Sequence, residues 1–105
     1  MLICGGLNVY PRVIEEAIYR HPDVAEVIVI GVPDAYRGQV ARAGVVMKNG
    51  RQPLQLTQLR DFLRDHLGKH ELPEQLVIRE QLPKTAIGKL SKKDFLAEES
   101  VNRSV

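Results

Sequence analysis

Apolar residues recur every three to four positions near the start of the chain, and this spacing predicts a helix over residues 11–20. The stripe consists of Val13, Ile14, Ala17 and Ile18. Pro11 suits the first turn of a helix, where an unpaired N–H is not needed. His21-Pro22 should end the helix, because the residue before a proline avoids the helical conformation.

Two denser apolar runs follow and predict a pair of strands. Residues 24–32 are so rich in β-branched side chains that this strand should be covered on both faces. Residues 39–48 instead alternate, with small and apolar residues on one face and Arg42 and Lys48 on the other. Only residues 33–38 connect the two runs, so the strands should pair antiparallel.

The second half of the chain predicts a further helix and a third strand. Thr57 is a suitable N-cap for a helix over 57–67, and Gly68 is a suitable stop after it. The buried stripe of this helix should consist of Leu59, Phe62, Leu63 and Leu67. A short strand is expected over 76–79, because residues there are mostly apolar and β-branched.

A last helix, over residues 92–99, is marked by a capping box. Ser91 stands three residues before Asp94, so the side chain of each can hydrogen-bond the backbone of the other. Leu90 and Phe95 flank the cap in the positions of a hydrophobic staple. The loop that precedes this helix should therefore end firmly at Leu90.

At the other end of the chain, Gly5-Gly6 separates two short apolar pieces and predicts a short β-hairpin. The resulting order is hairpin, helix, strand, strand, helix, strand, helix. It predicts an α+β fold in which helices pack against a small three-stranded sheet, with the hairpin added at the N-terminus. We expect one domain over residues 1–99 and a polar, flexible tail over 100–105.

Composition narrows the classes of function. A chain of 105 residues with 44% hydrophobic and 27% charged residues is expected to form one globular domain. Its net charge of +2 is too small for a duplex-binding face, so no nucleic-acid partner is expected. No apolar run approaches the roughly 20 residues of a transmembrane helix, and the first residues do not form a signal peptide. Cys4 is the single cysteine, so the reducing cytoplasm is the expected location.

Gly88-Lys89, in the loop over residues 82–90, is the first candidate for chemistry. A lysine is a mobile point charge with three donors, and a preceding glycine lets the backbone approach a ligand closely. The pair is not part of a Walker A loop, because Pro83 stands where that motif needs a glycine and Leu90 where it needs Ser or Thr. Taken alone, the pair favours a solvated surface lysine.

The other chemistry-bearing residues give weaker signals. Lys92 and Lys93 stand in the first turn of the last helix, where cations are disfavoured unless an anion lies near. His66 and His70 have a spacing seen in metal sites, but Gly68 interrupts the helix between them and no cysteine is near. No metal site is expected.

Three stretches of the chain, in their order and spacing, resemble the C-terminal domain of the adenylate-forming enzymes. This family comprises the AMP-forming acyl-CoA synthetases, the luciferases and the nonribosomal-peptide adenylation domains. The stretches are Gly5-Gly6-Leu7-Asn8-Val9-Tyr10-Pro11 with Ile14-Glu15, then Gly31-Val32-Pro33-Asp34 with Gly38, then Leu82-Pro83-Lys84-Thr85-Ala86-Ile87-Gly88-Lys89-Leu90. The resemblance covers about residues 1–98.

This resemblance implies a ligase that uses ATP and Mg²⁺ to convert a carboxylic acid, such as a fatty acid, into an acyl-adenylate. The acyl group then passes to the thiol of CoA. Lys89, preceded by Gly88, is the implied residue for the first step, where its charge bridges the carboxylate and the ATP phosphates. For the second step, the domain is implied to rotate and to present Gly5, Gly6 and Leu7 to the pantetheine arm.

The resemblance also implies a partner within the same enzyme. The acyl and adenine pockets of the family lie on a large N-terminal domain that this chain lacks. The chain therefore looks like a fragment, which should be inactive alone and hold no cofactor tightly. Val13 departs from the acidic residue usual at its position, whereas Glu15 keeps the family pattern.

Two alternatives stay open at this point. The enzyme could load a carrier protein instead of CoA, because none of these residues distinguishes the two acceptors. The chain could also be a non-enzymatic anion-binding module. In that case Lys89 would matter no more than Lys92 or Lys93.

Overall fold

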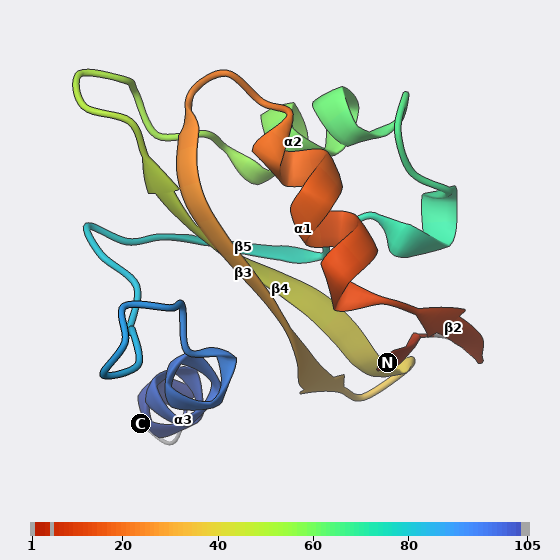
Figure 1. Ribbon diagram of the computed structural model, residues 1–105. Coiled ribbons are helices and arrows are strands. Elements are labelled where there is room, and N and C mark those ends of the chain that lie inside the picture. The colour runs from red at the N-terminus through yellow and green to blue at the C-terminus, as the bar shows by residue number, and fades with distance from the viewer. Residues whose placement is uncertain (1, 5, 104–105) are drawn as a thin grey trace.

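A mixed β-sheet separates two helical layers in the computed structural model, which describes residues 2–4 and 6–103. Figure 1 shows α1 (Pro11–Tyr19) and α2 (Leu56–Leu63) on one side of the sheet and α3 (Lys92–Arg103) on the other. This arrangement confirms the α+β class. It also means that the sheet must bury apolar side chains on both faces.

The sheet is organised around β4 (Gly38–Met47), which has strands on both edges. The long strand β3 (Val24–Asp34) pairs with it antiparallel along one edge, as expected. The short strand β5 (Gln75–Ile78) pairs with it in parallel. The predicted three-stranded sheet is therefore present, with a parallel third strand.

The N-terminal hairpin is present too, but it is not separate from the sheet. β1 (Leu2–Cys4) and β2 (Leu7–Val9) pair antiparallel, as predicted. Cys4 then pairs with Gly38 of β4, so the hairpin extends the sheet to five strands. This pairing places the turn of the hairpin next to the first residues of β4.

Successive residues of β3 enter two different cores, which explains its dense apolar sequence. Val27 and Val29 pack with the helices α1 and α2, whereas Ile28 and Ile30 pack on the side of α3. On the α3 side, Phe95 is the largest fully buried side chain. The prediction of a strand covered on both faces is confirmed.

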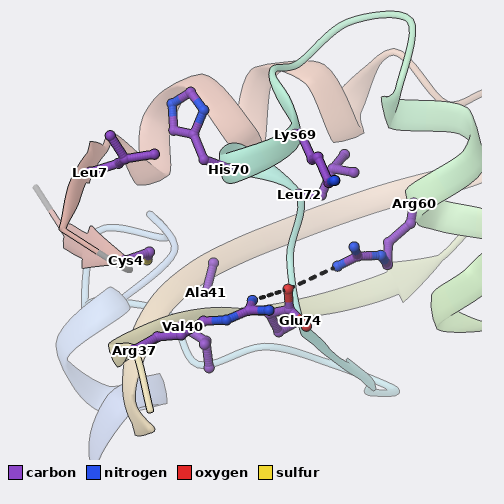
Figure 2. Close-up of a pocket in the computed structure, with 10 residues that line it drawn as sticks. All are labelled: Cys4, Leu7, Arg37, Val40, Ala41, Arg60, Lys69, His70, Leu72 and Glu74. Carbon is purple, nitrogen blue, oxygen red and sulfur yellow. Dashed lines mark hydrogen bonds and ion pairs between the residues drawn. The ribbon is translucent and has the colours of Figure 1, made fainter.

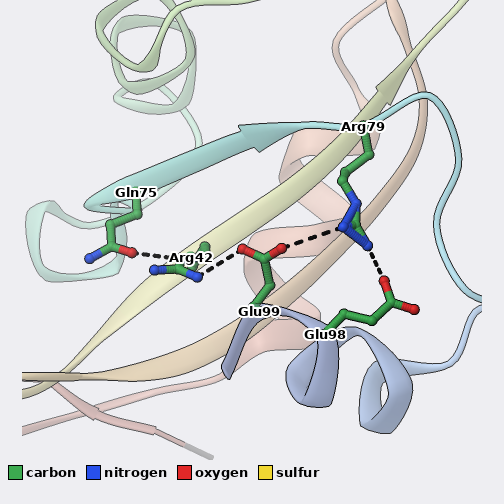
Figure 3. A network of polar contacts seen from close by, with 5 residues as sticks. All are labelled: Arg42, Gln75, Arg79, Glu98 and Glu99. Carbon is green, nitrogen blue, oxygen red and sulfur yellow. Dashed lines mark hydrogen bonds and ion pairs between the residues drawn. The ribbon is translucent and has the colours of Figure 1, made fainter. Parts of the chain in front are cut away.

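The side of β4 that carries Arg42 was expected to be polar, and it is covered by α3. Figure 3 shows how the charge is accommodated: Nη1 of Arg42 donates to Oε1 of Glu99 at 2.8 Å, and its Nε donates to Oε1 of Gln75 at 2.6 Å. Arg79 pairs with the other oxygen of Glu99 and with Glu98. Glu99 is buried, so this network attaches α3 to the sheet without leaving an unpaired charge.

The helix predicted over 57–67 begins earlier and is shorter. α2 spans Leu56–Leu63, and Gln55 is its N-cap rather than Thr57. The backbone N–H of Gln55 donates to Oε1 of Gln58 at 2.9 Å, which ties the first turn together without the threonine. The choice of Thr57 was therefore wrong, because a glutamine pair supplies the cap instead.

Gly68 does not act as the helix stop that the sequence predicted. Its φ of −68° and ψ of 157° are extended, and it precedes the short 3-10 helix η1 (Lys69–Glu71). Its N–H donates to Oε1 of Glu71 at 2.8 Å. The chain thus starts a new turn at Gly68 after α2 has already ended.

α3 starts where predicted, but only one half of the predicted capping box is found, because the N–H of Ser91 donates to the carbonyl of Pro83. The backbone N–H of Asp94 donates to Oγ of Ser91 at 3.2 Å, and Leu90 packs against the cluster that contains Phe95. The helix continues to Arg103, beyond the expected end, so residues 100–103 are helical rather than tail. Residues 104–105 lie outside the part of the chain that the structure describes.

Replacing Gly44 by alanine is expected to destabilise the fold by about 1–3 kcal/mol, because core positions tolerate added volume poorly. A Cβ at Gly44 would lie 2.3 Å from Cζ of Phe95, whose ring is fully buried and closes the α3 layer. Urea unfolding of the chain measures the loss. Gly68→Ala is the control, since its Cβ would meet the ends of two movable side chains, the ring of His70 at 3.1 Å and Oε1 of Glu71 at 3.3 Å. Equal losses in the two variants would contradict this packing.

Candidate functional site

The loop between β5 and α3 is a closed turn rather than an open loop. Lys84 and Leu90 face each other as an isolated antiparallel bridge. Within it, the N–H of Thr85 donates to the carbonyl of Lys89 at 2.7 Å, and the N–H of Gly88 donates to the carbonyl of Thr85 at 2.9 Å. Gly88 has a φ of +85°, a value that side chains disfavour. The glycine of the predicted pair is therefore required by the turn, and the lysine directly follows it.

Two lysines at the ends of this loop are tied down by carboxylates. Nζ of Lys84 lies 3.0 Å from Oε2 of Glu26 on β3. Nζ of Lys92 lies 3.2 Å from Oε2 of Glu15 on α1. The second pair supplies the anion that a cation in the first turn of α3 requires.

Lys89 differs from these two lysines. It is exposed, and no carboxylate of the described residues lies within 4.0 Å of its ammonium group. Ile87, two residues before it, is 79% exposed at the tip of the turn. The loop therefore presents an unneutralised cation and an apolar side chain to whatever approaches it.

The second predicted element is the turn of the N-terminal hairpin. Gly6 has a φ of +82°, and among the described residues no atom beyond its chain neighbours lies within 4 Å of an added Cβ; Leu7 is 52% exposed. Gly5 lies outside the described residues. Figure 1 places this hairpin and the lysine loop on different sides of the molecule. The structure therefore brings Gly88 together with Lys89 and Gly6 together with Leu7, but it does not bring the two pairs together.

A pocket of about 440 Å³ opens beside the glycine hairpin, and the sequence did not predict it. Figure 2 shows that it lies between the hairpin, the start of β4 and η1. Its lining residues are Cys4, Leu7, Arg37, Val40, Ala41, Arg60, Lys69, His70, Leu72 and Glu74. They come from segments far apart in the sequence, so no local motif marks them.

The pocket carries more positive than negative charge. Glu74 accepts a hydrogen bond from Arg37 and lies 3.3 Å from Nη1 of Arg60. Burial alone would raise the pKa of Glu74, but the hydrogen bond from Arg37 and the charge of Arg60 outweigh it and lower that pKa. Lys69 adds a third cation to the lining. One ionised carboxylate thus faces three cations, which suits an anionic ligand.

Cys4 lines the same pocket but is poorly suited to act as a nucleophile. Burial raises the pKa of its thiol; the charge of Arg37 opposes this rise and that of Glu74 adds to it. A thiol with a raised pKa stays protonated at neutral pH and reacts slowly. The pocket is therefore better described as a binding surface than as a catalytic centre.

Over residues 2–4 and 6–103, no group of three or more His, Cys, Asp or Glu could hold a metal ion. No helix in this part of the chain is both long and apolar enough to cross a bilayer.

Comparison with known proteins gives a consistent result. Residues 13–89 match the family described as AMP-binding enzyme C-terminal domain. The long-chain-fatty-acid–CoA ligase of Bacillus subtilis (strain 168) is 41% identical over 105 residues, which are 100% of this chain and 19% of the relative. The indoleacetate–CoA ligase of Aromatoleum aromaticum (strain DSM 19018 / LMG 30748 / EbN1) is 39% identical over 94 residues, 90% of this chain and 18% of the relative.

The fold is similar to that of solved structures as well. A fatty acyl CoA synthetase of Mycobacterium tuberculosis superimposes with a TM-score of 0.88 and 34% sequence identity, covering 97% of this chain and 20% of that chain. This chain therefore spans about a fifth of the length of the relatives that it matches.

Proposed function

Because this chain belongs to the AMP-binding enzyme C-terminal domain family, we propose that it is the small mobile domain of an AMP-forming acid–CoA ligase. The carboxylic acid would be a fatty acid or another organic acid, since the relatives named above include ligases for a long-chain fatty acid and for indoleacetate. The enzyme would act in the cytoplasm. Its partner would be a large N-terminal domain, corresponding to the part of the relatives that this chain does not match.

The observation that carries the proposal is the state of Lys89. Of the lysines in the loop, it directly follows the Gly88 turn and has no carboxylate partner among the described residues. A cation that is held in place but not neutralised can stabilise charge that develops on a ligand. We propose that this ligand is the carboxylate as it attacks the α-phosphorus of ATP and displaces pyrophosphate.

The glycine hairpin and the pocket beside it would serve the second step. A thiol must reach the acyl carbon through a narrow passage, and Gly6 offers a wall without a side chain. CoA also carries phosphates, for which Arg37, Arg60 and Lys69 of the pocket offer positive charge. We propose that CoA passes along this surface, with Leu7 between the hairpin turn and the pocket.

The two elements lie on different sides of the domain, so they cannot meet one substrate at the same time in one orientation. We therefore propose that the domain rotates between the two steps. ATP, Mg²⁺ and CoA would be bound by the complete enzyme. This domain would contribute Lys89 and the surface around Gly6 rather than the acyl and adenine pockets.

Pyrophosphate exchange into ATP tests this function. The chain alone should show no exchange, because it lacks the pockets for the acid and for ATP. The same chain joined to the large domain of its own protein should show exchange that depends on a carboxylic acid, and CoA should then release AMP. Exchange by the chain alone would contradict the proposal. A requirement for a carrier protein in place of CoA would favour the alternative acceptor.

A further inference from the structure

β3 forms one end of the sheet order, so the N–H groups along its outer edge need partners from outside the sheet. Two side chains of α1 supply them. The N–H of Val27 donates to the hydroxyl oxygen of Tyr19 at 3.3 Å, and the N–H of Val29 donates to Oε2 of Glu15 at 2.8 Å. Glu15 and Tyr19 are four residues apart on the helix, so both lie over this edge.

The same oxygen of Glu15 has a second partner on a different layer. Nζ of Lys92 lies 3.2 Å from it, although α1 and α3 are on opposite sides of the sheet. The carboxylate therefore lies at the edge of β3, where the two helical layers meet. The Glu15 side chain is 19% exposed and that of Lys92 is 47% exposed, so the carboxylate of this ion pair is shielded from water whereas the lysine is only half covered.

Lys92 is the first residue of α3 and stands three positions after Lys89. The other end of the lysine loop is attached to the same edge, through Lys84 and Glu26 at 3.0 Å. Between the two attachments, the N–H of Ser91 donates to the carbonyl of Pro83 at 2.8 Å and closes the base of the loop. Lys89 is thus carried by a loop whose two ends are both held by carboxylates at the β3 edge, one from α1 and one from β3 itself.

We propose that Glu15 is a positioning residue: through Lys92 it holds the lysine loop in the orientation from which Lys89 acts. The consequence for adenylation rests on the function proposed above, whereas the anchoring of the loop does not. The alternative role for Glu15 is only to cap the N–H of Val29. The two roles can be separated, because a glutamine keeps an oxygen that accepts from Val29 but loses the charge that attracts Lys92.

Glu15→Gln is therefore the test variant, and Glu16→Gln is the matched control. Glu16 is the next residue of α1, but it is 70% exposed and pairs with Arg12, which is 90% exposed. Amide hydrogen exchange of the chain should show faster exchange in Glu15→Gln at Thr85 and Ser91, whose N–H groups close the loop. The amides between β3 and β4 should exchange as before. Glu16→Gln should change neither set.

Activity of the full-length protein provides the second measurement. Glu15→Gln should lower the turnover number for adenylation by about ten- to a hundredfold, because a displacement of about 1 Å at a reacting group can cost about a hundredfold. The KM for ATP and the transfer of a pre-formed acyl group to CoA should stay nearly unchanged. Lys92→Met should give the same loss, Lys92→Arg should restore most of the rate, and the double variant should be no worse than either single one.

Unchanged loop exchange in Glu15→Gln would overturn the proposal, as would losses that add in the double variant. Equal losses in adenylation and in acyl transfer would also overturn it, because they would indicate damage to the fold. The failure of the proposed function would look different: Lys89→Ala would then leave adenylation intact, while the hydrogen-exchange result would still decide whether Glu15 anchors the loop.

Discussion

Lys89→Ala in the full-length protein is expected to lower the rate of acyl-adenylate formation by at least about a hundredfold, the effect of removing one preorganised donor to developing charge. The rate of acyl transfer from pre-formed adenylate to CoA should change less than about twofold, because Lys89 would not contact the reacting atoms in that step. Pyrophosphate exchange measures the first step. Thioester formation from synthetic acyl-adenylate measures the second.

The reason is the isolation of this cation. Lys84 and Lys92 are neutralised by Glu26 and Glu15, whereas Lys89 faces solvent at the end of a hydrogen-bonded turn. Its ammonium group breaks no ion pair of the described residues when it meets an anionic transition state, so only its hydration has to be given up. The alanine variant should therefore fold normally and fail in one reaction only.

Lys93→Ala is the matched control, because Lys93 is also exposed and lies four residues further along. It should retain adenylation within about twofold, since an exposed charge away from the reacting atoms has only a small screened effect. Similar losses in Lys89→Ala and Lys93→Ala would contradict a specific role. They would favour a general anion-binding surface instead.

Gly6→Asn is expected to do the reverse: it should lower thioester formation by about ten- to a hundredfold and leave pyrophosphate exchange intact, since obstruction near a reacting group has effects of this order. Asparagine tolerates the left-handed conformation better than other residues with a side chain, so it suits the φ of +82° at Gly6. Among the described residues, no atom beyond the chain neighbours lies within 4 Å of the added Cβ, so the side chain would occupy open space at the surface where we propose that the thiol passes.

Gly50→Asn controls for the conformation of the backbone. Gly50 has a φ of +78° and equally open surroundings, but it lies in the turn after β4, away from the hairpin. It should leave both half-reactions unchanged. A loss of thioester formation in Gly50→Asn as large as that in Gly6→Asn would show that the effect is one of folding and not of the passage.

Much of the fold could be predicted because each element carries a local signal. The alternation in β4, the stripe on α1 and the cap at Ser91 all concern residues within one or two turns of each other. The parallel pairing of β5 with β4 is not local, since it depends on where α2 and η1 return the chain. The start of α2 was misplaced for a different reason, because a Gln55–Gln58 pair replaces the usual cap residues.

The site divides in the same way. Gly88-Lys89 and Gly6-Leu7 could be singled out because they belong to continuous motifs, and the structure shows a positive φ at both glycines. The ion pair that distinguishes Lys92 from Lys89 could not be predicted, because its carboxylate belongs to Glu15, which is far from Lys92 in the sequence. The pocket residues Arg37 and Lys69 were missed too, since neither stands in a recognisable pattern.

The claim that one small domain serves two reactions with two separate surfaces is tested most directly by measuring both half-reactions in the same two variants. Lys89→Ala should lose pyrophosphate exchange and keep thioester formation from pre-formed acyl-adenylate. Gly6→Asn should keep exchange and lose thioester formation. This crossed pattern is the predicted result. If both variants are impaired in the same half-reaction, or each in both to the same extent, the division of labour between the two surfaces is wrong.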